Sequence, residues 1–196
     1  KLMHSDLPSL LSHLALKNSI DQFIHLSALG IESATDSKYA SSKLNGEKKI
    51  RQNFPRSVIL KPSIVYSVDD NFTTNFMSLL SKLPIMPLYY QGKTKFTPIH
   101  VSDLVSIIFE IVRKNIIGET IECVGPEVFT FKEILQKILK SINKKRLLFP
   151  LPLPLAKINA KLFEMLPKPL LTMDQLKLLK YDNIISKKYK TNFDLK

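Results

Sequence analysis

The sequence has one cysteine, Cys123, and few long apolar runs among its 196 residues. A single cysteine excludes a disulfide framework and any metal site built from several cysteines, and it makes a reducing compartment the expected environment. The longest uninterrupted apolar stretch, residues 147–156, is short and contains three prolines, so it is not a membrane-spanning helix of about 20 residues. The four histidines form no HxxxH pair, and we therefore expect no metal site.

Arginine is also scarce, because only 4 of the 29 basic residues are arginine. Arginine is the side chain best suited to bidentate contacts with phosphate and guanine, and no nucleic-acid-binding motif is visible. The net charge of +12 is concentrated in residues 131–196, which hold 15 basic and 5 acidic side chains. We therefore expect no nucleic acid as a partner, and instead an acidic protein or membrane surface for this basic block.

The composition, with 44% apolar and 23% charged side chains, is typical of a soluble globular protein. Apolar spacing and turn residues predict helices and strands in alternation. The predicted helices cover residues 5–18, 37–53, 71–82, 102–114, a segment beginning at Thr130, 154–166 and 173–181, and the predicted strands cover 22–27, 57–61 and 120–124, with an extended piece over 96–101. This order favours a parallel α/β sheet over residues 1–130, followed by a helical, basic region over 131–196.

The first predicted helix shows an apolar stripe formed by Leu7, Leu10, Leu11 and Leu14. Residues at this spacing share one face of a helix, so the stripe predicts a buried face.

The pattern that carries chemistry is Tyr39-Ala40-Ser41-Ser42-Lys43 on the second predicted helix. Residues four apart lie on one helix face, so the Lys43 ammonium can stabilise the Tyr39 phenolate and lower the pKa of Tyr39 from about 10. A tyrosine of this kind can exchange a proton with a carbonyl or alcohol. A second copy, from Tyr89 to Lys93, contains Gln91-Gly92 between prolines and is not expected to be helical.

Six blocks of the sequence give the Tyr39 pattern a specific context. They are FIHLSALG (23–30), YASSKLNGE (39–47), LKPSIVY (60–66), FTPIHVSD (96–103), GPEVFTF (125–131) and PLLTMDQ (169–175). In this order they resemble the short-chain dehydrogenase/reductase superfamily. More narrowly, they resemble its atypical, NAD-dependent epimerase/dehydratase-like branch, which includes the alpha-subcomplex subunit 9 of respiratory complex I (NADH:ubiquinone oxidoreductase) and bacterial relatives. The resemblance implies a Rossmann-like sheet that binds NAD or NADP.

The resemblance also implies roles for particular residues. Lys43 would bind the nicotinamide ribose and tune Tyr39, the acid/base group. Pro62, Ser63 and Ile64 would line the nicotinamide pocket, and Ser27 would lie near the ribose. The serine that polarises the substrate carbonyl in typical members aligns better with Ala28 than with Ser27, which weakens the case for turnover. An exposed helix pair without chemistry is the alternative for Tyr39 and Lys43.

A second departure from the family concerns the glycine-rich turn that holds the cofactor pyrophosphate. The five glycines stand at 30, 46, 92, 118 and 125, so no GxGxxG pattern can be formed. We therefore expect the chain to be the C-terminal part of a longer protein, without the first strands of the sheet. We also expect the chain alone to bind a nicotinamide dinucleotide very weakly.

Two isolated residues are assigned structural roles. His100 is expected to be a hydrogen-bonded structural histidine rather than a catalytic one, and Cys123 to be a small buried side chain within an apolar strand.

Three functions stay open from the sequence. The first is an NAD(P)-binding structural or assembly subunit linked to complex I, with weak or no turnover, in the cytoplasm or on the inner face of a bacterial or mitochondrial-type inner membrane. The second is an active oxidoreductase or epimerase that uses Tyr39 and Lys43 on a carbonyl or sugar-nucleotide substrate. The third is a basic protein-interaction module that binds no nucleotide.

Overall fold

The computed structural model describes residues 2–164 and 172–195, without the side chains of 159–163. Residues 169–171 of the last sequence block, and residues 165 and 166 of the helix predicted over 154–166, therefore lie outside the described part.

A parallel four-stranded sheet forms the centre of the first lobe, in the order β1-β2-β7-β10. Its strands are β1 (Ile24–Leu26), β2 (Val58–Pro62), β7 (Thr120–Cys123) and β10 (Lys190–Thr191). Every residue of β2 is buried, as expected of a central strand covered on both faces. The predicted parallel α/β sheet is confirmed.

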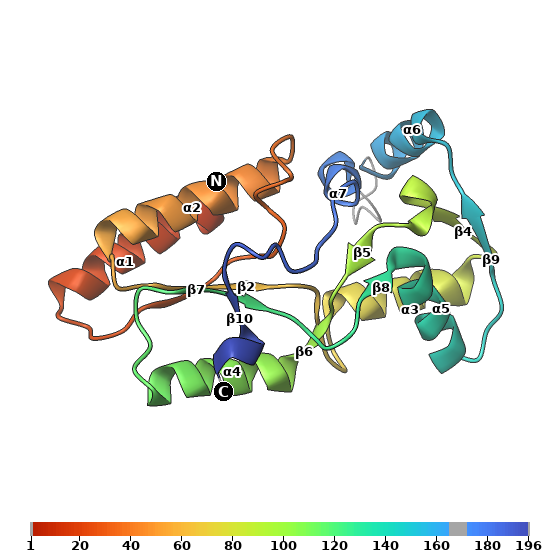
Figure 1. The fold of residues 1–196 in the computed structure, drawn as a ribbon. Coiled ribbons are helices and arrows are strands. Elements are labelled where there is room, and N and C mark those ends of the chain that lie inside the picture. The colour runs from red at the N-terminus through yellow and green to blue at the C-terminus, as the bar shows by residue number, and fades with distance from the viewer. Residues whose placement is uncertain (1, 165–171, 196) are drawn as a thin grey trace.

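Helices cover both faces of this sheet. One face carries α1 (Leu7–Lys17), which follows a π-helical turn (Leu2–Asp6), and α2 (Lys38–Asn53); the other carries α4 (Val101–Arg113) (Figure 1). The helices predicted over 37–53 and 102–114 are thus confirmed to within a residue.

The predicted burial of the leucine stripe on α1 is wrong. Leu7, Leu10, Leu11 and Leu14 are 37–54% exposed. Helix α1 meets α2 through small polar side chains instead, because the Asn53 amide donates to the Ser9 carbonyl at 2.8 Å. The π-helical turn before α1 also approaches α2 closely at Gly46, where an added Cβ would lie 2.1 Å from the carbonyl oxygen of His4.

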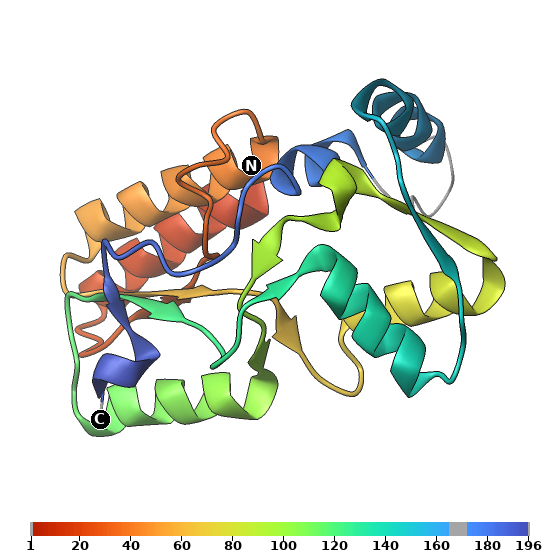
Figure 2. The ribbon, with the colours of Figure 1, turned by 45° about the vertical axis from the view of Figure 1, so that its right-hand side comes forward.

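The second lobe is built from short strand pairs and the helices around them (Figure 2). Its elements are α3 (Asn71–Lys82), β4 (Ile85–Leu88), β5 (Lys95–Phe96), β8 (Phe129–Thr130), α5 (Phe131–Ser141), β9 (Leu147–Pro150) and α6 (Leu153–Glu164). Strand β4 pairs with β9 in parallel, and β5 pairs with β8 antiparallel. Phenylalanines and leucines from α3, β5 and α5 form one buried cluster.

Two connecting pieces join the lobes. Strand β3 (Val65–Tyr66) pairs with β6 (Ile99–His100), so the predicted extended piece over 96–101 is divided between β5 and β6. The second YxxxK copy lies in a 3-10 turn (Tyr89–Gly92) where Tyr90 and Gln91 have positive φ angles, which confirms that it is not an α-helix.

The region 131–196 is not purely helical. Besides α5, α6 and α7 (Met173–Leu178) it contributes β9, β10 and a final 3-10 turn (Asn192–Leu195). Because β10 pairs with β7, the end of the chain returns to the main sheet (Figure 1). The division of the chain at residue 130 stays a prediction.

No helix in the described residues is both long and apolar enough to cross a bilayer.

Candidate functional site

The N-terminus of helix α2 is held from two sides. The Ser37 side chain caps the helix by accepting a hydrogen bond from the Ala40 amide at 3.2 Å. The Asp174 carboxylate, on α7, accepts hydrogen bonds from the Lys38 and Tyr39 amides at 2.8 and 3.0 Å and from the Ser37 hydroxyl at 2.9 Å. Burial alone would raise the pKa of Asp174, but these hydrogen bonds lower it. Tyr39 is therefore placed at a fixed helix end.

Tyr39 and Lys43 lie on one face of α2, as predicted, with the Lys43 Nζ 5.8 Å from the centroid of the Tyr39 ring. The expected lowering of the Tyr39 pKa is wrong for this arrangement. Burial raises the pKa of Tyr39, and burial lowers the pKa of Lys43. The Lys43 ammonium donates to the carbonyls of Leu26 and Ser27 at 3.0 and 3.3 Å, at the end of β1.

Glu47, one helical turn after Lys43 on the same face of α2, belongs to a buried ion cluster. The Lys61 Nζ, whose side chain is 1% exposed, lies 2.7 Å from the carboxylates of both Glu32 and Glu47. Burial alone would lower the pKa of Lys61, but the two carboxylates raise it. The Ser27 hydroxyl donates to Glu47 as well. The cluster fixes α2 against the ends of β1 and β2.

The residues after β2 form a second anchored segment. The Pro62 carbonyl accepts from the Leu29 amide at 2.9 Å, and the Ser63 hydroxyl donates to the Asn183 side chain at 2.5 Å. Asn183 also donates to the Leu29 carbonyl at 2.5 Å. One side chain from the C-terminal segment thus ties together the ends of two neighbouring strands.

A cavity of about 460 Å³ opens between these strand ends, α3 and α7. Of the residues proposed from sequence, Tyr39, Pro62, Ser63 and Ile64 line it. Ser27 and Lys43 do not line the cavity, whereas Ala28, the residue after Ser27, does. The remaining lining residues are Leu29, Gly30, Ile31, Ala34, Asn71, Phe72, Asn75, Phe76, Leu79, Phe96, Phe131, Gln175, Leu178, Leu179, Tyr181, Asp182 and Asn183.

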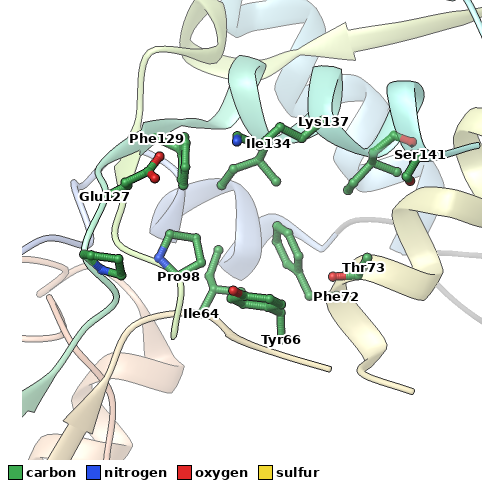
Figure 3. Close-up of a pocket in the computed structure, with 12 residues that line it drawn as sticks. Ile64, Tyr66, Phe72, Thr73, Pro98, Glu127, Phe129, Ile134, Lys137 and Ser141 are labelled. Carbon is green, nitrogen blue, oxygen red and sulfur yellow. Dashed lines mark hydrogen bonds between the residues drawn. The ribbon is translucent and has the colours of Figure 1, made fainter. Parts of the chain in front are cut away.

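A second cavity of about 420 Å³ adjoins the first, because Ile64 and Phe72 line both. Figure 3 shows Phe129 and Ile134 across the cavity from these two side chains. The Lys137 ammonium lies 4.4 Å from the centroid of the Phe129 ring.

The other residues assigned from sequence have structural surroundings. His100 caps α4 through its ring nitrogen, which accepts from the Ser102 amide at 3.3 Å. Cys123 is fully buried, and burial raises the pKa of its thiol to about 12. Both structural predictions are confirmed.

Sequence reasoning missed Glu47, Lys61, Asp174 and Asn183. A signal existed for two of them. Glu47 continues the four-residue spacing of Tyr39 and Lys43, and Lys61 is a lone charge in an apolar strand. The roles of Asp174 and Asn183 depend on contacts across more than 130 positions, which no local pattern reveals.

A family model for the RmlD substrate binding domain matches residues 32–170, well over half of the chain. The chain belongs to the RmlD substrate-binding domain family. The match includes helix α2, the residues that follow β2 and the elements of the second lobe.

Two curated relatives confirm the resemblance to the complex I branch. The chain is 32% identical to NADH dehydrogenase [ubiquinone] 1 alpha subcomplex subunit 9 of Dictyostelium discoideum, over 63% of this chain and 35% of the relative. It is 26% identical to the mouse protein of the same name, over 92% of this chain and 48% of the relative. The chain thus spans about half the length of these relatives or less.

Solved structures support the fold. A dTDP-4-dehydrorhamnose reductase from Bacillus anthracis, solved with NADP, superposes with a TM-score of 0.65 at 15% identity, over 78% of this chain and 58% of the reductase. The predicted Rossmann-like α/β fold is thereby confirmed for this RmlD-family chain.

Proposed function

We propose that the chain is part of a nicotinamide-dinucleotide-binding subunit of respiratory complex I, with a structural or assembly role and weak or no turnover. The similarity to two alpha-subcomplex subunits supports the partner. The observation that favours weak turnover is that an alanine, and not a serine, lines the cavity at the end of β1. Ala28 lines the larger cavity, whereas the Ser27 hydroxyl is turned to Glu47, so no serine at this strand end is free to polarise a substrate carbonyl.

The residues present fit the ribose end of NAD or NADP. An ammonium has three N–H donors, and Lys43 gives two to carbonyls of β1, so one remains for a ribose hydroxyl. Pro62, Ser63 and Ile64 line the adjacent cavity wall. The dinucleotide, when bound, supplies or accepts a hydride. The sequence has no GxGxxG turn whose backbone N–H groups could hold the pyrophosphate, so we expect very weak binding by these 196 residues alone.

The test uses the complete gene product with Tyr39→Phe, and Tyr66→Phe as a matched control outside the larger cavity. Complex I content on native gels is expected to fall when the gene is deleted and to be restored equally by the wild type and both variants. Co-purification of NAD or NADP with the complete gene product is expected as well. An intact complex I in the deletion strain would refute the subunit role.

The second candidate is an active oxidoreductase or epimerase. One observation favours it: Tyr39 lines the cavity, and its hydroxyl has no hydrogen-bond partner among the described residues. Because burial raises the pKa of Tyr39, the phenol is protonated at neutral pH and can donate its proton to a carbonyl oxygen whose carbon receives the hydride. In this case Tyr39→Phe alone would abolish function at unchanged protein level, while Tyr66→Phe would not.

For the basic region we propose contact with an acidic surface of complex I or of the inner membrane, which would place the protein peripherally there. Support comes from a shallow basic depression around α5, lined by Lys132, Lys140, Lys144, Lys145 and Arg146. None of the four lysines forms an ion pair within the described residues. Sedimentation with anionic but not neutral vesicles would indicate the membrane, and binding to neither, with retention in purified complex I, would indicate a protein surface. Retention there without co-purifying nucleotide would favour an interaction module that binds no nucleotide.

A further inference from the structure

The chemistry of the larger cavity restricts what it can hold. Its described walls are mostly aliphatic and aromatic, and no lysine, arginine or histidine is among them. Among the wall residues that the structure describes, Asp182 alone has a charged side chain, and its carboxylate accepts a hydrogen bond from the Lys95 amide at 2.8 Å. The cavity therefore has no positive side chain to offer an anion.

Most polar groups of the wall are already paired within the protein. Asn183 bridges the Ser63 hydroxyl and the Leu29 carbonyl. The Gln175 side chain accepts from the Thr172 amide at 2.9 Å as part of a helix cap. The Tyr39 hydroxyl has no such partner among the described residues. The wall thus presents the Tyr39 hydroxyl, the amides of the exposed Asn71 and Asn75, and the Tyr181 hydroxyl, which accepts from Lys180 at 3.4 Å, within a mostly apolar surface.

A sugar nucleotide does not suit this environment, because its pyrophosphate carries two negative charges. Burying these charges without a cation is costly, and Asp182 would repel them. A volume of about 460 Å³ lies within the range of small-molecule pockets. We infer that the cavity binds a molecule with a long apolar chain and a single carbonyl or hydroxyl group, which lies at Tyr39, and that it does not bind a sugar nucleotide.

The neighbouring cavity supports a chain-like ligand. Ile64 and Phe72 separate the two cavities, and beyond them lie Phe129 and Ile134 (Figure 3). Apolar side chains thus continue past the wall that the two cavities share, and Glu127 and Lys137 also line the second cavity (Figure 3).

This inference deepens the proposed function, since the ligand's polar end lies at the proposed acid/base residue. The experiment needs no nicotinamide nucleotide, however, so the two proposals can fail separately. The probes are 1-hexanol, 1-octanol and 1-decanol, with UDP and dTDP as the competing class, each titrated calorimetrically into the chain.

The affinity is expected to rise about fourfold for each added methylene until the cavity is filled. UDP and dTDP are expected to show no binding. An affinity for the alcohols that does not change with chain length, no binding of decanol, or binding of UDP or dTDP more tightly than decanol would each overturn the inference. None of these outcomes would affect the result of the assembly test.

Two exposed positions on α3 locate the bound alcohol. Asn75 lines the cavity and Ser78, one turn later, does not. Asn75→Trp is expected to narrow the opening and weaken decanol binding at least tenfold, whereas Ser78→Trp is expected to leave it unchanged. Equal binding by wild type and both variants, or equal loss in both, would show that decanol binds elsewhere.

Discussion

Beneath helix α2 the protein buries charges, whereas between α3 and α5 it buries aromatic rings. In the first region the Lys61 ammonium lies 2.7 Å from two carboxylates. In the second the Phe131 ring packs against Phe76 and Phe96, with ring centroids 5.4 and 6.4 Å apart. Burial of apolar area is non-directional, but a buried ion requires its partners at fixed positions. The charged cluster therefore fixes the geometry beside Tyr39, and the aromatic cluster supplies a cohesive wall for the cavities.

A substitution in the aromatic region should cause the largest loss in the free energy of unfolding. Phe131 is 1% exposed, so Phe131→Ala is expected to lower the free energy of unfolding by about 4 kcal/mol through lost contacts and a cavity. Chemical denaturation measures this value. Phe193→Ala is the control, since Phe193 is 43% exposed, and it should cost less than about 1 kcal/mol. Similar losses in both variants would show that the α3–α5 cluster is not a core.

A substitution in the charged region should cause a smaller loss in the free energy of unfolding. Lys61→Met keeps the volume but leaves Glu47 and Glu32 without their cation, and a loss of about 3 kcal/mol is expected. The control Lys49→Met breaks a pair whose side chains are 36% and 43% exposed, and should cost less than about 1 kcal/mol.

A second substitution distinguishes ion pairing from packing at this position. Glu47→Leu combined with Lys61→Met removes one of the two carboxylates left without a cation, so part of the lost stability is expected to return. A double variant less stable than the sum of the two single losses would contradict the account of Lys61 given above.

The pH dependence of stability should come from the same region through His25. Burial lowers the pKa of His25 to about 4, and its Nε2 has no hydrogen-bond partner among the described residues. As pH falls from 6.5 towards 4, the unfolded chain takes up a proton before the folded chain does, so stability is lost in that window. At pH 4.5 the expected loss in the free energy of unfolding from this group is about 2.5 kcal/mol.

Unfolding curves at pH 7 and 4.5 measure this loss. His25→Phe should remove that part of the pH dependence, while His13→Phe, on the exposed side of α1, should retain it. An unchanged pH profile in His25→Phe would mean that other groups cause the loss.

The smallest expected effect concerns the start of α5. Thr130 and Glu133 form a reciprocal cap, in which the Glu133 carboxylate accepts from the Thr130 amide at 2.7 Å. Thr130→Ala should cost about 1 kcal/mol, measured by thermal unfolding. Thr172→Ala removes the same type of cap from α7 and should cost a similar amount. A much larger loss in Thr130→Ala would indicate that the aromatic region depends on hydrogen bonding as strongly as the charged one.

Local patterns in the sequence predicted the helices that carry the site. Ser37 begins α2 because its side chain can cap the helix, and the spacing of Tyr39 and Lys43 placed both on one face. The same reasoning failed for Leu10 on α1, since helical spacing identifies a face without saying what covers it. It also failed for the pKa of Tyr39, because burial is a property of the assembled fold.

The contacts made by Asp174 and Asn183 have a consequence for the order of events during synthesis. Asp174 holds the first turn of α2, and Asn183 joins Leu29 to Ser63. These contacts span more than 100 positions, and such distant pairings form late because the intervening chain must first be closed into a loop. The ribosome must therefore release residue 183 before the surroundings of Tyr39 can be completed. Until then the nascent chain has strands β1, β2 and β7 of the main sheet but an unfinished site.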